Sequence, residues 1–297
     1  MKIAEEHLAA VRAFGYTEAE ARFLYLVATH SGYFVLRQFL NMTGAKWGRR
    51  TAKFIRKLER SNHTNCRKYF GIGAVYHLYS KSLYAQIGRE NLGNHRSHSV
   101  EFIQTRLVLL DFIIANQQHD YFETEAHKTA YFSETLGIPK TALPVRTYAG
   151  PSSSDPALRY FADKLPIFLD GSVDLSNSPV TFCYVESTVA GGAGLRRHLD
   201  AYKQLLSNLA GFSLVYVSNT TANFPAAERC FAAFREELRE NRLAEMIRYF
   251  TLRARRDEGG TAPRIKEVGS LTGRLQAPRQ DCFRRIRQTL YGTREGE

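Results

Sequence analysis

Two apolar segments on either side of a helical pattern constrain the fold of this chain more than any other feature. Pro179–Glu186 (PVTFCYVE) and Phe212–Val217 (FSLVYV) have the length and composition of buried strands. A small-residue turn, Ala190–Gly194, and an amphipathic helix over Leu195–Leu209 lie between them. This order predicts a βαβ unit with parallel pairing, so the fold class is α/β (α+β over the whole chain) with a mixed sheet.

Further elements are predicted around this unit from apolar periodicity and turn residues. They are a helix over Val100–Asn116, strands over Tyr121–Glu125, Lys164–Leu169 and Tyr249–Leu252, a helix beginning with Pro225–Arg239, and a basic helix over Cys282–Leu290. The polar segment Arg89–Ser99 reads as a linker. We therefore expect three regions: a domain over 1–95, a domain over 96–252, and a basic, partly disordered tail over 253–297.

The N-terminal region predicts a second kind of unit. Thr17 and Glu20 form a capping-box pattern at the start of a helix. The elements expected after this cap are helices over Ala19–His30, Val35–Met42 and Ala45–Arg60, then strands over Asn65–Phe70 and Ala74–Tyr79 joined by a glycine turn. A helix, a short helix, a basic helix and a hairpin follow one another in a winged helix-turn-helix, whose third helix enters the DNA major groove.

Positive charge is concentrated in this same region. The chain has a net charge of +12, and residues 1–100 carry 16 Lys and Arg against 6 Asp and Glu. Segregated positive charge favours a polyanion such as double-stranded DNA. The predicted DNA-binding residues are Lys46, Arg49, Arg50, Lys53, Arg56 and Lys57 on the third helix and Arg67 and Lys68 on the hairpin. Trp47 is expected in the core. The alternative is a protein-interaction adaptor whose basic helix meets an acidic partner.

Two acids flank the strands of the second domain as in a restriction-endonuclease-like site. Asp163 precedes one strand and Glu186 ends the next, so both are expected at one edge of the sheet, where they could hold Mg²⁺. The lysine usual two positions after the glutamate is replaced by Thr188, and Lys203 on the following helix could take its place.

Other acids compete for these roles. Glu125 could add a third carboxylate, and Asp170 and Asp174 are rivals of Asp163 for the first position. The alternative without catalysis is that Asp163 caps a turn and Glu186 closes a strand.

Several protein classes are disfavoured. The four cysteines form no CxxC pair, which argues against a disulfide-stapled module or a zinc finger. Glu5 and Glu6 interrupt the apolar stretch that a signal peptide needs, and Phe102–Ala115 is too short to span a bilayer. We expect a cytoplasmic protein with no membrane partner. The oligomeric state stays open, with a homodimer as one option.

Three segments together resemble the replication-relaxation family of plasmids and other mobile elements. They are Arg49–Tyr79, His98–Ile114 and Phe182–Leu206 (FCYVESTVAGGAGLRRHLDAYKQLL), within a resemblance over about residues 18–250. The resemblance implies a winged helix joined to a restriction-endonuclease-like domain, and a role in replication, mobilisation or their regulation beside proteins of those processes.

This sequence departs from the family at one position. The family commonly has an acid two positions after the strand's glutamate, where this chain has Thr188. The departure favours a DNA-binding protein with a catalytically degenerate nuclease-like domain. The alternative is a Mg²⁺-dependent DNA nuclease or nickase targeted by the winged helix.

Overall fold

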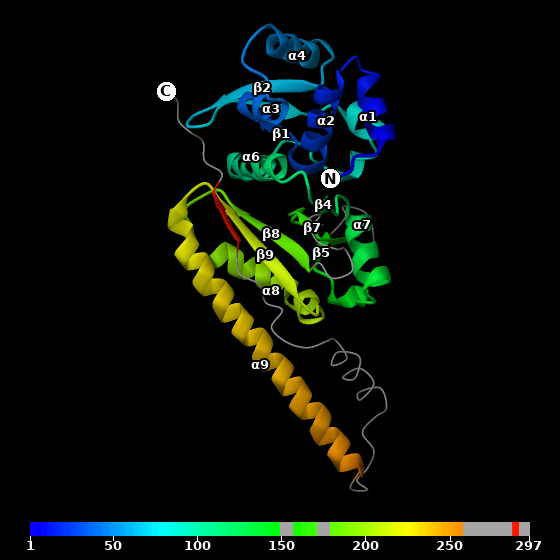
Figure 1. Cartoon of the computed structure of the whole chain (residues 1–297), viewed down its shortest axis with the longest axis vertical. Helices are drawn as coiled ribbons and strands as arrows, with labels where there is room; N and C mark the ends of the chain where they lie inside the picture. The colour runs from blue at the N-terminus through cyan, green and yellow to red at the C-terminus, as the bar shows by residue number, and fades with distance from the viewer. Residues whose placement is uncertain (149–156, 171–178, 258–286, 291–297) are drawn as a thin grey trace.

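A computed structural model describes residues 1–148, 157–170, 179–257 and 287–290. The chain is a mixed α/β protein in which an N-terminal helical part with a small sheet is stacked on a part built around a larger sheet (Figure 1). Among the described residues, no helix combines the length and the hydropathy that crossing a bilayer requires.

The N-terminal part contains short helices and a three-stranded antiparallel sheet of order β1-β3-β2. Its elements are α1 (Glu5–Arg12), α2 (Glu18–Leu26), η1 (Val27–Ser31), β1 (Tyr33–Val35), α3 (Leu36–Thr43), α4 (Arg49–Arg60), β2 (Thr64–Tyr69), β3 (Gly73–Leu78), α5 (Lys81–Gln86) and η2 (Glu90–Leu92). The predicted helices and hairpin are therefore present. Helix α1 and strand β1 are not among the predicted elements.

Local chemistry explains where two of these helices begin. The predicted capping box is confirmed: Glu20 donates its backbone N–H to the Thr17 hydroxyl, and Glu20 Oε2 accepts from the Thr17 N–H at 2.8 Å. The helix expected from Ala45 begins only at Arg49, because Gly44 adopts a left-handed conformation that ends α3 (φ 64°), and a loop follows it. Lys46 and Trp47 consequently lie on this loop.

The second part contains the βαβ unit. Its elements are α6 (Val100–Ala115), β4 (Asp120–Tyr121), α7 (Glu125–Ala130), η3 (Tyr131–Thr135), η4 (Lys140–Ala142), β5 (Val145–Tyr148), β6 (Ala157–Tyr160), β7 (Ile167–Leu169), β8 (Val180–Glu186), α8 (Ala193–Ser207), β9 (Phe212–Ser218), η5 (Thr221–Asn223), α9 (Phe224–Asp257) and β10 (Arg287–Leu290).

The larger sheet has five strands in the order β10-β9-β8-β7-β4. Strands β8 and β9 pair in parallel through α8, as predicted, and β10 pairs in parallel with β9. Strands β7 and β4 are antiparallel to their neighbours, so the sheet is mixed. A second small sheet, the antiparallel pair β5-β6, lies beside it.

Alternating side chains on β8 and β9 give the sheet two buried faces. Cys183 and Val215 belong to the core shared with α6 and the N-terminal helices, whereas Phe182 and Leu214 belong to the core shared with α8 and α9. Helix α6 is thus buried between the sheet and the N-terminal part (Figure 1). The predicted linker is also packed, since Asn94 is buried and donates to two carbonyls of the N-terminal part. The domain boundary at residue 95 stays a prediction.

The C-terminal predictions are wrong in two places. Tyr249–Leu252, expected as a strand, is part of α9, which continues because no glycine or proline interrupts the chain between Ala226 and Asp257. Arg287–Leu290, expected as helix, forms β10, because pairing along the edge of β9 outweighs local propensity. The rest of the expected tail, 258–286 and 291–297, lies outside the described residues.

Candidate functional site

Helix α4 has one buried and one exposed face. Phe54 is fully buried, and its ring stacks on that of Phe39 with centroids 4.2 Å apart and an interplanar angle of 15°. Thr51 and Leu58 share this face, whereas Arg50 and Lys53 are exposed on the other. The aromatic core thereby fixes the orientation of the exposed face.

Six of the predicted DNA-binding cations are exposed and have no acidic partner within the part of the chain that the structure describes. They are Lys46, Arg49, Arg50, Lys53, Arg67 and Lys68. They come from the loop before α4, from α4 itself and from β2, which lie at one end of the molecule (Figure 1). We call these six residues the α4 surface. Their charges are available to an external anion.

The other two predicted cations are placed differently. Arg56 is exposed and donates its Nε–H to the Ala52 carbonyl at 3.3 Å, a bond within its own helix. Lys57 lies 2.6 Å from Glu20 Oε2 and keeps 23% of its side chain exposed. It therefore ties α4 to the capping box of α2 instead of extending the α4 surface.

Two exposed aromatic residues accompany the α4 surface. Trp47, expected in the core, is 72% exposed, because it lies on the loop between Gly44 and Gly48 and not on the helix. Phe70 is fully exposed in the hairpin turn between β2 and β3. Neither residue is predicted at the surface from the sequence, although the glycines beside them are a usable signal for loops.

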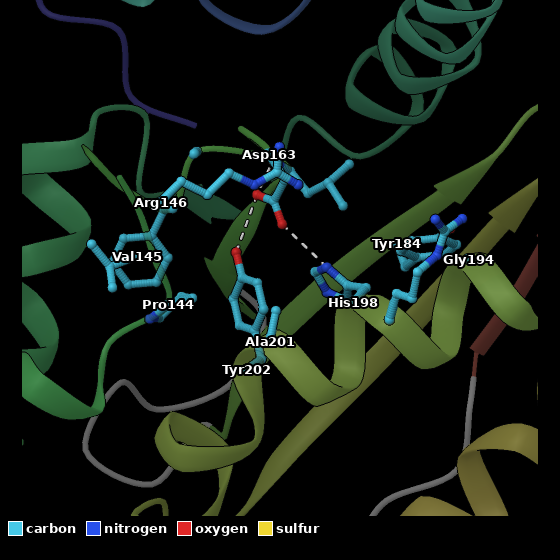
Figure 2. Close-up of a pocket in the computed structure, with 13 residues that line it drawn as sticks. Pro144, Val145, Arg146, Asp163, Tyr184, Gly194, His198, Ala201 and Tyr202 are labelled. Atoms are coloured by element: carbon cyan, nitrogen blue, oxygen red, sulfur yellow. Dashed lines mark hydrogen bonds and ion pairs between the residues drawn. The ribbon is translucent and has the colours of Figure 1, made fainter. Parts of the chain in front are cut away.

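Asp163 is held by three donors in the turn before β7. Its Oδ1 accepts from the Tyr202 hydroxyl and from the Leu165 N–H, each at 3.1 Å, and its Oδ2 lies 3.1 Å from His198 Nδ1 (Figure 2). Burial raises the pKa of Asp163, but His198, the charge of Lys128 and the Leu165 N–H together lower it to about 2. The carboxylate is therefore ionised and fully engaged.

Buried cations surround this carboxylate. Lys128 donates to the Leu165 carbonyl at 2.7 Å, and Arg106 donates to the Asp163 carbonyl at 3.1 Å. Burial lowers the pKa of Lys128 to about 8 and that of Arg106 to about 10, and in both cases the Asp163 charge opposes the change. The negative charge of Asp163 is thus balanced from inside the protein.

Glu186 and Lys203 lie apart from that network. Glu186 ends β8 and accepts hydrogen bonds from the hydroxyls of Tyr184 at 3.3 Å and Thr188 at 3.1 Å. Lys203 Nζ lies 3.3 Å from Glu237 on α9 and forms no ion pair with Asp163. The three predicted catalytic residues are therefore held by separate sets of contacts.

The remaining acids are also engaged elsewhere. Glu125 accepts from the Tyr160 N–H at 2.8 Å, and Asp170 lies 3.4 Å from His119. The third rival, Asp174, lies outside the described residues. Among those described, no three His, Cys, Asp or Glu side chains converge as a metal site would require. Asp163, hydrogen-bonded on both oxygens and surrounded by cations, does not fit a Mg²⁺ ligand in this arrangement.

Comparisons with known proteins add no family to this picture: no family model matches the chain, and neither a curated protein nor a solved structure matches it significantly.

Proposed function

We propose that this protein binds double-stranded DNA through the α4 surface, with α4 as the recognition helix and the β2–β3 hairpin as the wing of a winged helix-turn-helix. The observation that carries the proposal is the set of six exposed cations without acidic partners in the described part of the chain. Unpaired cations gain the most from phosphates, because no internal ion pair has to be broken before they bind.

The position of each cation suggests its contact. Arg49, Arg50 and Lys53 lie in the first half of α4, the part of a recognition helix that usually contacts base edges. Arg67 and Lys68 lie on β2 of the wing and are suited to phosphate oxygens, which fix position but carry no sequence information. The Lys57–Glu20 ion pair would hold α4 at a fixed angle to the helix before it.

The exposed aromatic residues fit the same surface. Trp47 immediately precedes the start of α4, and Phe70 lies in the turn of the wing. Aromatic side chains beside basic residues can pack on sugars or stack on accessible bases. Trp47 is the one tryptophan of the chain, so its fluorescence reports directly on this surface.

The resemblance to the replication-relaxation family suggests the process that this binding would serve. On this basis we propose a role in the replication or mobilisation of a plasmid or another mobile element, or in the regulation of these events. The second part of the chain would then provide a further binding surface for DNA or for a partner protein.

The test is a fluorescence-anisotropy titration of a labelled DNA duplex at several salt concentrations, with Trp47 emission followed in parallel. If all six cations neutralise phosphates, log K falls against log salt with a slope of about −5. Reversing two charges on α4 (Arg49→Glu with Arg50→Glu) should weaken binding roughly a hundredfold or more.

A matched control reverses two exposed cations of the other part, Lys140→Glu with Arg229→Glu, which changes the net charge by the same amount. This control should bind within a fewfold of the wild type. Equal losses in the two double variants would reduce the interaction to net charge and contradict an α4 interface. Unchanged DNA binding in the α4 variant would favour the adaptor alternative.

A further inference from the structure

A cavity of about 360 Å³ opens between β5 and α8, next to Asp163 (Figure 2). This volume lies at the lower end of the range for small-molecule sites. Tyr184 from β8 and Tyr202 from α8 line it, together with His198 between them. The backbone beside Asp163 is also unusual, because Phe161 and Lys164 have positive φ values of 51° and 56°. Such conformations cluster at active sites and ligand clamps.

His198 presents one ring nitrogen to this cavity. Its side chain is only 8% exposed, and its Nδ1 is held by the ionised Asp163. The other ring nitrogen, Nε2, has no hydrogen-bond partner in the described structure. A buried, oriented imidazole of this kind can form a hydrogen bond with a ligand hydroxyl, which can act as donor or as acceptor.

Two arginines supply positive charge to the same cavity. Arg146 on β5 and Arg197 on α8 are both exposed, and neither has an acidic partner among the described residues. Burial raises the pKa of Tyr202 while the charge of Arg146 opposes the change, and Arg197 has the same opposing effect on Tyr184. Each guanidinium therefore acts on a different tyrosine of the cavity wall.

The charge balance of the cavity is positive. The Asp163 carboxylate lies in the cavity wall, and the buried cations Lys128 and Arg106 already balance its negative charge. Glu186, which accepts from the Tyr184 hydroxyl, adds one negative charge near the wall, so Arg146 and Arg197 together leave a net positive charge. Planar guanidinium groups with paired donors match phosphate oxygens particularly well.

We propose that this cavity binds a small phosphate ester that carries a hydroxyl group, such as a sugar phosphate or a nucleotide. The phosphate lies between Arg146 and Arg197, and the hydroxyl forms a hydrogen bond with His198 Nε2. The site is separate from the α4 surface and does not depend on the proposed DNA binding.

The direct test is isothermal titration calorimetry of the full chain with ribose 5-phosphate and AMP, each compared with inorganic phosphate, ribose and adenosine. Both esters should bind more tightly than inorganic phosphate, and the two uncharged compounds should give no heat. Absence of binding by both esters, or equal binding of ribose and ribose 5-phosphate, overturns the proposal.

The variants Arg146→Ala and Arg197→Ala should each weaken binding of ribose 5-phosphate about tenfold, because each removes a charge-assisted hydrogen bond. Both arginines are exposed, so neither change should alter the thermal unfolding midpoint. Arg229→Ala, at an exposed arginine of α9, is the matched control and should bind as the wild type does. If both cavity variants bind ribose 5-phosphate as tightly as the wild type does, the proposed phosphate site is wrong.

Nuclear magnetic resonance of the His198 imidazole nitrogens gives a second readout that does not depend on a variant folding. Ribose 5-phosphate should shift the Nε2 resonance strongly and the Nδ1 resonance weakly. An unchanged Nε2 resonance at saturating ligand contradicts the hydroxyl contact.

A phosphorylated strand end carries the same chemistry as the free ester, and one comparison separates the two sources. A short oligonucleotide with a 5′-phosphate is titrated against the same oligonucleotide with a 5′-hydroxyl, in the Arg49→Glu and Arg50→Glu background that disables the α4 surface. Preference for the phosphorylated oligonucleotide identifies a strand end as ligand. If the two oligonucleotides bind equally and ribose 5-phosphate still binds to this variant, the free ester is identified as the ligand.

Discussion

Two helices of this protein carry clusters of basic residues in opposite ways. On α8, Arg196 contacts Glu237 at 2.6 Å and Asp200 at 3.0 Å, and Lys203 lies 3.3 Å from the same Glu237. On α4, Arg49, Arg50 and Lys53 have no acidic partner in the described part of the chain. Arg196 and Lys203 are therefore paired with acids of α9 and of α8 itself, whereas these three cations of α4 remain available.

The difference shows that the number of basic residues does not identify a binding surface. Both helices have an amphipathic pattern, but only the three-dimensional structure reveals the acid on α9 that faces α8. The same contrast distinguishes two uses of arginine on a single helix, since Arg196 is paired and the neighbouring Arg197 lines the cavity without an acidic partner. The predictions below test this distinction, from the largest expected effect to the smallest.

The largest effect should come from the buried face of α4. Phe54→Ala removes a fully buried ring that stacks on Phe39 and should lower the free energy of unfolding by about 3–5 kcal/mol. Arg50→Ala, on the exposed face of the same helix, should leave the unfolding free energy unchanged within error. Urea denaturation of both variants checks this. Similar unfolding free energies for the two variants would mean that aromatic packing does not stabilise the position of α4.

Acid should destabilise the protein through groups that the core keeps uncharged. Burial lowers the pKa of His30 to about 4, with contributions from Lys128, Arg89 and Arg106, against the raising effect of Glu123. The unfolded chain takes up a proton at this histidine below about pH 6.5, whereas the folded chain does so only near pH 4. The resulting stability is complete above pH 6.5 and falls by about 3 kcal/mol between these two values.

His30→Leu, which nearly conserves volume, should reduce this loss, and urea denaturation from pH 7 to pH 4 measures it. His98, whose pKa burial also lowers to about 4, keeps part of the dependence in the variant. The exposed His127 is the matched control, and His127→Leu should keep the wild-type pH profile. An identical profile in His30→Leu would show that this histidine is already protonated in the folded state.

A smaller effect should follow when the paired cations of α8 are released. Glu237→Gln removes the acceptor shared by Arg196 and Lys203 and raises the net charge by one. If position and not net charge determines DNA binding, affinity for a duplex should change by less than about twofold at physiological salt. Anisotropy titration measures it. A gain in DNA affinity as large as that expected from an added cation on α4 would contradict the distinction between the two helices.

How far the sequence predicts this molecule depends on the range of the interactions involved. The capping box at Thr17 and the basic face of α4 depend on residues three or four positions apart, and both were predicted correctly as local structure. The parallel pairing of β8 and β9 was also predictable, because a short crossover helix allows few other arrangements.

The partners of the site residues were not predictable in the same way. Asp163 contacts His198 and Tyr202, which follow it by 35 and 39 residues, and Lys203 contacts Glu237 on a different helix. The one local signal was the spacing of His198 and Tyr202, which places them on one face of α8. The prediction that Trp47 lies in the core fails because the helical period does not extend N-terminal to Arg49, and Trp47 lies on the preceding loop.

The smallest effect distinguishes contacts within the α4 surface itself. Lys68 lies on β2 of the hairpin and is exposed, so Lys68→Ala should remove one phosphate contact. The slope of log K against log salt should become less steep by about one unit, while relative affinities for different duplex sequences stay the same. Lys81→Ala, at an exposed lysine on α5, is the control and should keep the full slope.

Arg50→Ala should instead reduce the ratio of affinities between different duplex sequences, because a base contact carries specificity. If Lys68 and Arg50 variants lose affinity equally for all sequences, α4 acts only as a phosphate-binding surface and its role as the recognition helix is wrong.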